Sequence, residues 1–402
     1  MAFAKISKTI TGITGGECMN YQVTEELKSY VASHMHQMCA LLKTLTLILA
    51  PSHFEDRRAA FIRDWLTGIG AEGVYIDSAK NVIFPYGCEG KDDLVVFAAH
   101  TDTVFPMETP LEFSDDGENF RCPGVGDDTA CVSVILMTIQ YLLQSKIRPR
   151  KGILFVFNAC EEGLGNLKGT RRLFSDYAGR ISRFYTYDGR YSHVVNRSVG
   201  SYRYRIHAKT QGGHSWSNFG RRNAIHVLSR VIGELYTMEL PGRENTRTTF
   251  NVGSIEGGTS VNTIAQSASM LFEYRSDDPW CIDKMTEQFN AKLEKLQKEI
   301  PDAEILVETV GIRPCGEANN KQLQEEMVRR VVEVCQNTSG LECKRNSGST
   351  DCNIPLSLGI PAVCVGVYLG GGTHTREEWV NKASLKTGLL IGAQLILDYC
   401  EI

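Results

Sequence analysis

The stretch Leu94-Val-Val-Phe-Ala-Ala-His-Thr-Asp-Thr103 is an apolar strand that leads directly into a histidine and, two residues later, an aspartate. Side chains two positions apart in an extended chain point to the same side, so His100 and Asp102 face the same way. One of them can bind a metal ion while the other holds its far ring nitrogen. The stretch alone fits a hydrogen-bonded structural histidine equally well, so a metal site needs partners from elsewhere in the chain.

Length and composition indicate a soluble protein with more than one domain. The chain has 402 residues, of which 42% are apolar and 22% are charged, and one hydrophobic core rarely grows to that size. The formal net charge of −4, without runs of Lys and Arg interleaved with aromatics, excludes nucleic acid as a partner. No run of 18 apolar residues exists, which excludes a membrane helix.

The N-terminus and the cysteines indicate a cytoplasmic protein. Residues 1–8 lack the apolar run and cleavage site of an export signal. The 13 cysteines are odd in number and scattered without CxxC pairs, so we expect reduced thiols that act as small apolar residues.

Apolar strands alternate with helical segments in the first part of the chain, which predicts an α/β domain. Ser52 is placed to cap the second helix, with Glu55 in the capping-box position. The alternation predicts a mostly parallel sheet that is covered on both faces by helices. In such sheets, ligands bind at the carboxyl ends of the strands. The expected strands are 74–77, 94–99, 153–157 and 184–187, and the expected helices are 23–49, 54–68 and 129–143.

After Asn196 the pattern changes to β-α-β-β-α-β, the order of a ferredoxin-like α+β domain. From about Gly311 the chain returns to α/β character. We therefore predict a three-layer α/β domain formed by residues 1–196 and 313–402, with residues 197–312 inserted as a ferredoxin-like α+β domain.

Acidic residues follow the expected strands at several further points. Arg121-Cys-Pro-Gly-Val-Gly-Asp-Asp-Thr-Ala130 is a glycine-bearing loop that opens a helix, and its glycines allow Asp127 to approach another group closely. Asp128 can be explained as a helix cap just as well. Glu161 and Glu162 directly follow a buried strand, where paired carboxylates need a cation between them or a shared proton. Because adjacent residues point in different directions, one of the two can bind a metal while the other acts as a general base.

Two more candidate ligands lie at strand ends, Asp188 in Tyr185-Thr-Tyr-Asp188 and His374 in Gly371-Gly-Thr-His-Thr-Arg-Glu-Glu378. Together with His100, Asp127 and the glutamate pair they give two histidines and three acids as candidate metal ligands. One of the two glutamates is then not needed as a ligand. Two zinc ions about 3.5 Å apart require such a mixture, with one carboxylate bridging them.

The motifs HTDT, PGVGDDTA, NACEEG, YDG, GGHS and GGTHTREE, in this order, resemble the M20 family of co-catalytic zinc metallopeptidases. That family includes peptidase T, carboxypeptidases of the glutamate carboxypeptidase type and amino-acid deacylases. The resemblance implies a cis peptide bond between Asp127 and Asp128. It also implies roles for individual residues: His100, Asp127 as the bridge, Glu162, Asp188 and His374 as metal ligands, Asp102 as the clamp on the His100 ring, and Glu161 as the general base.

The resemblance implies that residues 1–196 and 313–402 form the zinc-binding catalytic domain and that residues 197–312 form a lid or dimerisation domain. In this inserted domain, His214 resembles a family histidine that stabilises the oxyanion, in dimeric members from the partner subunit. Asn262 and Arg275 match the family's N-x(12)-R spacing, whose members contact a substrate carboxylate or carbonyl, although a solvated surface arginine is the alternative. The sequence departs from the family where Thr129-Ala130 replaces a lysine-containing pair and where Ala265 replaces a proline. These departures concern the substrate subclass and remove no ligand.

The resemblance implies hydrolysis of an amide by a metal-bound hydroxide, with two zinc ions, or manganese or cobalt in their place. An aspartate at the position of Asp188 tends to accompany aminopeptidase or tripeptidase activity, so we expect a peptidase T-like exopeptidase acting on short peptides. A carboxypeptidase or N-acyl-amino-acid deacylase is the alternative, and a homodimer could form through the inserted domain. A protein of the same fold that binds without turnover is disfavoured, because it would not need Glu161.

Overall fold

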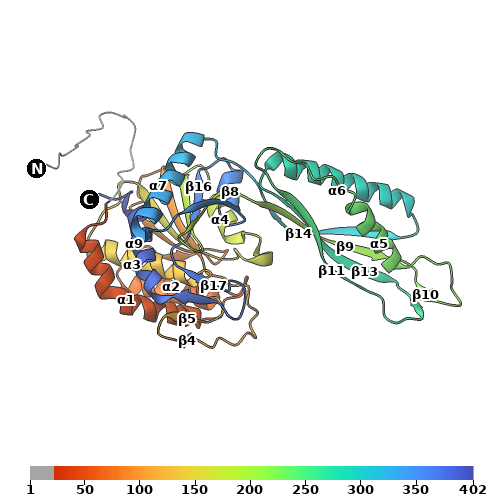
Figure 1. Cartoon of the computed structure of the whole chain (residues 1–402), viewed down its shortest axis with the longest axis horizontal. Coiled ribbons are helices and arrows are strands. Elements are labelled where there is room, and N and C mark those ends of the chain that lie inside the picture. The colour runs from red at the N-terminus through yellow and green to blue at the C-terminus, as the bar shows by residue number, and fades with distance from the viewer. Residues whose placement is uncertain (1–21, 402) are drawn as a thin grey trace, which may run out of the picture.

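An eight-stranded sheet forms the centre of the larger of two bodies in this computed structural model, which describes residues 22–401 (Figure 1). The N-terminal residues 1–8 considered above, and the first part of the predicted 1–196 segment, lie outside the described residues. The strand order is β1-β2-β6-β3-β7-β16-β8-β15. The bounds are β1 Tyr75–Ile76, β2 Val82–Tyr86, β3 Leu94–His100, β6 Gly152–Asn158, β7 Ile181–Tyr187, β8 His193–Ser198, β15 Lys344–Gly348 and β16 Ala362–Val365.

The central strands β6, β3, β7 and β16 are parallel, whereas β1, β2 and β8 introduce antiparallel pairs. Every residue of β3 and β6 is buried. Val95 and Phe97 enter one hydrophobic core, while Leu94 and Val96 enter another on the opposite face. Apolar side chains on both faces of the strands thus require helices on both sides, which makes the three layers expected from the sequence.

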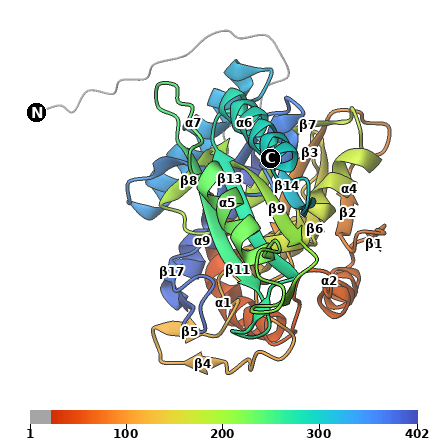
Figure 2. The same cartoon turned by 90° about the vertical axis from the view of Figure 1, so that its right-hand side faces the viewer.

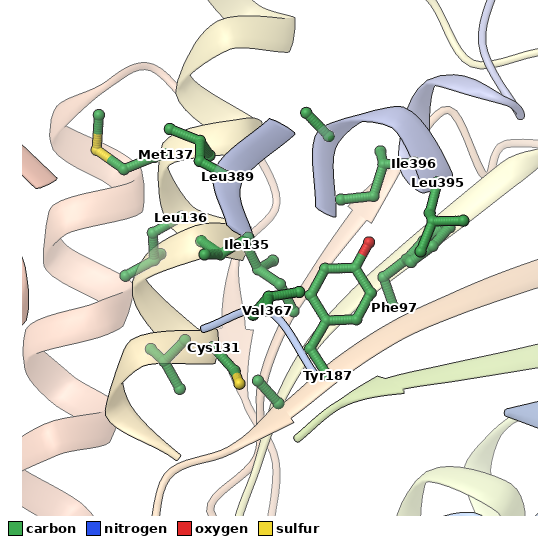
Figure 3. Close-up of a cluster of buried hydrophobic side chains, with 14 of the residues drawn as sticks. Phe97, Cys131, Ile135, Leu136, Met137, Tyr187, Val367, Leu389, Leu395 and Ile396 are labelled. Carbon is green, nitrogen blue, oxygen red and sulfur yellow. The ribbon is translucent and has the colours of Figure 1, made fainter. Parts of the chain in front are cut away.

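The helices of the larger body divide between these two cores. The first core takes α1 Glu25–Thr46, α2 Asp56–Gly68, α3 Thr129–Gln144, α7 Lys321–Ser339 and α9 Lys382–Leu397. The second core takes α4 Lys168–Asp176 and α8 Asn353–Ser357. Figure 3 shows Tyr187 of β7 among side chains of α3 and α9 in the first core, and its hydroxyl donates to the Gly392 carbonyl at 2.7 Å.

The smaller body is a four-stranded antiparallel sheet in the order β11-β13-β9-β14, with two helices on one face (Figures 1 and 2). Alternate residues of β9, such as Tyr204 and Ile206, pack with both helices, while the residues between them lie on the opposite face. The chain order and the strand order together match the ferredoxin-like plan. The bounds are β9 Gly200–Lys209, α5 Ala224–Leu235, β11 Thr248–Gly257, β13 Ser267–Ser276, α6 Pro279–Glu299 and β14 Glu304–Arg313.

Short strands are the main elements that the sequence pattern did not predict. Strand β15 covers part of the Gly-Ser-rich segment 346–350, and β2 contains Pro85. Two small sheets were also missed. One consists of β4 Ser114–Asp115, β5 Asn119–Arg121, β17 Gly370–Gly371 and β18 Trp379–Asn381, and the other of β10 Gly213–His214 and β12 Thr263–Ile264.

The expected cap at Ser52 is wrong. Helix α2 has Glu55 at its N-cap position, without a side-chain capping bond. The Ser52 hydroxyl instead donates to Asp102 Oδ2 at 2.6 Å, and Glu55 Oε1 accepts the backbone N–H of His53 at 2.9 Å and of Cys160 at 3.1 Å. Bonds to an ionised carboxylate are stronger than a neutral cap, and here they join the loop to the segments that follow β3 and β6.

Within residues 22–401, no helix has both the length and the apolar character needed to cross a bilayer. The twelve cysteines in this part of the chain are free thiols, in agreement with their expected use as apolar side chains.

Gly388 of α9 lies against the backbone of Val367, and a Cβ at this position would be only 1.5 Å from the Val367 carbonyl oxygen. Gly388→Ala is therefore expected to lower the free energy of unfolding by about 3 kcal/mol or more, because backbone has to move. Gly233→Ala in α5 is the control, since a Cβ there meets nothing within 4 Å. This substitution should raise the free energy of unfolding by at most about 1 kcal/mol. Urea unfolding of both variants measures the difference, and equal stabilities would contradict the close approach of α9.

Candidate metal and catalytic site

Asp127 lies between two histidines at the carboxyl edge of the large sheet. His100 Nε2 is 3.0 Å from Asp127 Oδ1, and His374 Nε2 is 3.1 Å from Asp127 Oδ2. His374 Nε2 also lies 3.0 Å from Glu162 Oε1. Each oxygen of one carboxylate thus faces a different imidazole, as a bridging ligand between two cations does.

The remaining candidate ligands complete two overlapping groups. Asp188 directly follows β7 and groups with His100 and Asp127, while Glu162 and His374 group with Asp127 on its other side. In each group the possible ligand atoms lie within 4.8 Å of one another. The structure therefore brings together all five residues that the sequence singled out as metal ligands.

The protonation of these groups indicates a strong demand for positive charge. Hydrogen bonds to Asp127 and Glu162 raise the pKa of His374 to about 10. Burial, followed by the charge of Asp127, raises the pKa of Asp188 to about 7. Divalent cations would supply this charge in place of the protons, and imidazole nitrogens with carboxylate oxygens are the donors that zinc, manganese or cobalt use.

Asp102 connects His100 to the two glutamates. His100 Nδ1 is 3.0 Å from the Asp102 carbonyl oxygen and 3.4 Å from its Oδ1, so the backbone makes the shorter contact with the ring. A proton on Nδ1 leaves Nε2 free to act as a ligand. The Asp102 carboxylate accepts the N–H groups of Glu161 and Glu162, each at 2.9 Å, and therefore also orients the turn after β6.

Glu161 forms a buried ion pair with Arg313, a residue that sequence reasoning missed. Arg313 Nη1 donates to Glu161 Oε1 at 3.0 Å, and the two side chains are 6% and 7% exposed. Burial raises the pKa of Glu161, and the charge of Arg313 opposes that rise. Arg313 is the last residue of β14, 152 positions away in the sequence, and no local motif marks it.

Glu378 is a second missed residue, although it lies within the quoted GGTHTREE motif. Its buried carboxylate accepts the N–H groups of Gly124, Gly126 and Asp127, each at 2.8 Å. These three bonds fix the loop that carries Asp127. An acid four residues after a candidate ligand, within the same motif, is the sequence signal that could have identified it.

The peptide bond between Asp127 and Asp128 is cis, as the resemblance implied. Asp128 occupies the N-cap position of α3, but its side chain makes no capping bond. Its Oδ2 accepts the backbone N–H of His100 at 3.0 Å, so the cap interpretation of this side chain is wrong.

Asp351 is a third missed residue, and it lies behind the candidate ligands. It is buried, its Oδ2 accepts a hydrogen bond from Asn158 at 2.7 Å, and Thr170 donates to its Oδ1. It thereby holds Asn158, the last residue of β6, at the start of the turn that carries Glu161.

The structure does not bring His214 and Asn262 to this cluster. They lie together at the end of the smaller body far from the larger one, where His214 pairs with Thr263 and the Ser215 N–H donates to the Asn262 carbonyl (Figure 1). Arg275 lies on β13 next to the end of that strand, opposite Ser201. Its partner there is Glu273, with Nε to Oε1 at 2.9 Å.

Glu378→Gln is expected to weaken metal binding by about ten- to a hundredfold, because an amide NH₂ would face backbone N–H groups and release the Asp127 loop. Glu377→Gln is the matched control, since Glu377 is exposed next to it. Metal titration by calorimetry checks this. Equal affinities in the two variants would show that Glu378 does not hold the loop.

Comparisons with known proteins find relatives that cover most of the chain. Carboxypeptidase G2 from Pseudomonas sp. (strain RS-16) is 26% identical over 328 residues, which cover 78% of this chain and 75% of that protein. Acetylornithine deacetylase from Pasteurella multocida is 21% identical over 400 residues, covering 92% and 99%. A tripeptidase structure from Staphylococcus aureus superposes with a TM-score of 0.71 at 22% identity, covering 91% and 97%.

The profile of Peptidase family M20/M25/M40 matches residues 96–398, a segment that runs from β3 to the end of the last helix. That segment contains every residue of the cluster described above. The chain is therefore a metallopeptidase-type hydrolase, and it belongs to Peptidase family M20/M25/M40.

Proposed function

We propose that this protein is a dinuclear zinc exopeptidase that hydrolyses short peptides in the manner of an aminopeptidase or tripeptidase. The observation that carries the proposal is the position of Asp127, whose two carboxylate oxygens face His100 and His374. Glu161 lies next to His100 in the same cluster. Manganese or cobalt could replace zinc with the same donors. In this proposal His100, Asp127 and Asp188 hold one cation, and His374, Asp127 and Glu162 hold the other.

Two cations at these positions would polarise the scissile carbonyl and make a water acidic enough to react near neutral pH. Glu161 takes the proton of the attacking water and returns it to the leaving amine. Arg313 supports this role, because its bond to Oε1 fixes the direction of the carboxylate and its charge favours the ionised form.

His214 is proposed to act in the site of a second copy of this chain. Its Nδ1 accepts the N–H groups of Trp216 at 3.2 Å and Ser217 at 3.3 Å, so the neutral ring carries its proton on Nε2. That proton can be donated to an oxyanion. Trp216 and Phe219 beside it are 87% and 92% exposed, which supports a protein contact at this end of the smaller body.

The substrate class separates the main proposal from its alternative. Asp188 and the similarity to a tripeptidase structure support a peptide substrate. The relatives carboxypeptidase G2 and acetylornithine deacetylase favour the alternative, a carboxypeptidase or N-acyl-amino-acid deacylase.

Assays of the zinc-loaded protein with tripeptides and with N-acetyl amino acids decide between the two. We expect a kcat/KM at least tenfold higher for tripeptides, with release of the N-terminal residue. Higher values for N-acetyl amino acids, or release of the C-terminal residue, would establish the alternative.

Glu161→Gln tests the proposed general base. The amide keeps an oxygen for Arg313 but accepts no proton, so kcat should fall by a factor of about 10² to 10⁴. Metal content should stay at two ions per chain, measured by plasma emission spectroscopy, and the melting temperature checks that the fold is intact. Activity that survives with both metals bound would rule out Glu161 as the base.

A further inference from the structure

Arg275, Ser201 and Arg313 form one row across the sheet of the smaller body. Ser201 of β9 is the register partner of both Arg275 on β13 and Arg313 on β14. Neighbouring strands are about 4.8 Å apart, so the outer two Cα atoms are about 10 Å from each other. Side chains in one register row share a face, and here it is the face opposite α5 and α6.

This face is turned toward the catalytic loop at its end near the larger body. Arg313 reaches Glu161 from it. Arg203, one row further along, donates from Nη1 to the Gly163 carbonyl at 2.6 Å, directly after Glu162. Arg275 therefore belongs to the part of the sheet that faces the candidate active site of its own chain.

The side chains of this row offer more hydrogen-bond donors than acceptors. Ser201 Oγ and Arg313 Nε are buried and have no hydrogen-bond partner among the described residues. Burial, followed by the charges of Arg313 and Arg275, lowers the pKa of Arg203, and the charge of Glu273 opposes this. Unpaired buried donors next to guanidinium groups fit a carboxylate.

Glu273 supplies a carboxylate at this place from within the chain. Its Oε1 accepts from Arg275 Nε at 2.9 Å and its Oε2 from Arg275 Nη2 at 3.0 Å, so it occupies the side of the guanidinium group formed by Nε and Nη2. Its Oε2 is also 3.4 Å from Arg203 Nε. The Glu273 and Arg275 side chains are 28% and 38% exposed, so a ligand from solvent can reach the pair.

We propose that Glu273 is a specificity-determining residue, an internal carboxylate that occupies Arg275 until the carboxylate of a substrate replaces it. The Nε and Nη2 donors of Arg275 hold one carboxylate in bidentate form. A substrate carboxylate that binds to these two donors therefore has to displace Glu273. The displaced side chain stays paired with Arg203, which limits the cost of the exchange. The proposal rests on the proposed function, because it takes the substrate to be a short peptide with a free carboxylate.

Glu273→Gln tests the exchange in the zinc-loaded, full-length protein with two substrates, trialanine and trialanine amide. Removing the competing charge should lower KM for trialanine by about two- to fivefold, the range of a partly exposed ion pair, with kcat unchanged. KM for trialanine amide should not change. Glu308→Gln is the matched control, because Glu308 lies on the same sheet face and pairs with His207 at 3.7 Å.

A double-mutant cycle then locates the effect, since Glu273→Gln should leave KM unchanged in an Arg275→Gln background. A higher KM for trialanine in Glu273→Gln would overturn the proposal and make Glu273 a residue that merely positions Arg275. Equal changes for both substrates would overturn it as well.

Failure of the proposed function gives a different result. If the wild type hydrolyses neither substrate, that function is wrong, and calorimetric binding of trialanine decides about Glu273. Tighter binding by Glu273→Gln than by the wild type supports the exchange, whereas equal or weaker binding contradicts it.

Discussion

The burial of several carboxylates at one edge of a sheet is the constraint on which this structure depends. Asp127, Glu161 and Glu162 are each no more than 9% exposed, and Asp128 and Asp351 lie beside them. Ionised carboxylates cannot be buried together unless positive charge is close, and otherwise they take up protons. The raised pKa values of His374 and Asp188 are the response of the protein alone to that requirement. Cations that replace these protons would supply the same positive charge. They would also polarise the scissile carbonyl.

The supporting residues show how the chain holds this costly arrangement in place. Arg313, from the smaller body, pairs with Glu161. Glu378 binds the loop that carries Asp127, and Asp102 binds the turn that carries both glutamates. Buried Arg58 adds a bond from Nη1 to the Thr101 carbonyl at 2.9 Å, directly after His100. Each of these contacts joins segments distant in sequence, so the geometry of the site depends on the tertiary fold as a whole.

The sequence predicted those parts of the fold and site that local pattern determines. The apolar run of β3, buried on both faces, and the acids and histidines at strand ends were visible because each is a short contiguous signal. The ferredoxin-like order of the second body followed in the same way. Strand β15 was missed because its pairing with β8 overrides a Gly-Ser-rich composition, and Ser52 was misassigned because a buried carboxylate outcompetes a helix cap. Arg313 could not be predicted, since only the return of the chain at the end of β14 brings it to Glu161.

The central claim, that Asp127 bridges two cations held by different histidines, is tested most directly by diffraction from zinc-soaked crystals at the zinc absorption edge. The account predicts two anomalous peaks about 3.5–4 Å apart, one beside His100 and Asp188 and the other beside His374 and Glu162, with Asp127 between them. A single peak, or two peaks that do not share Asp127, would contradict it.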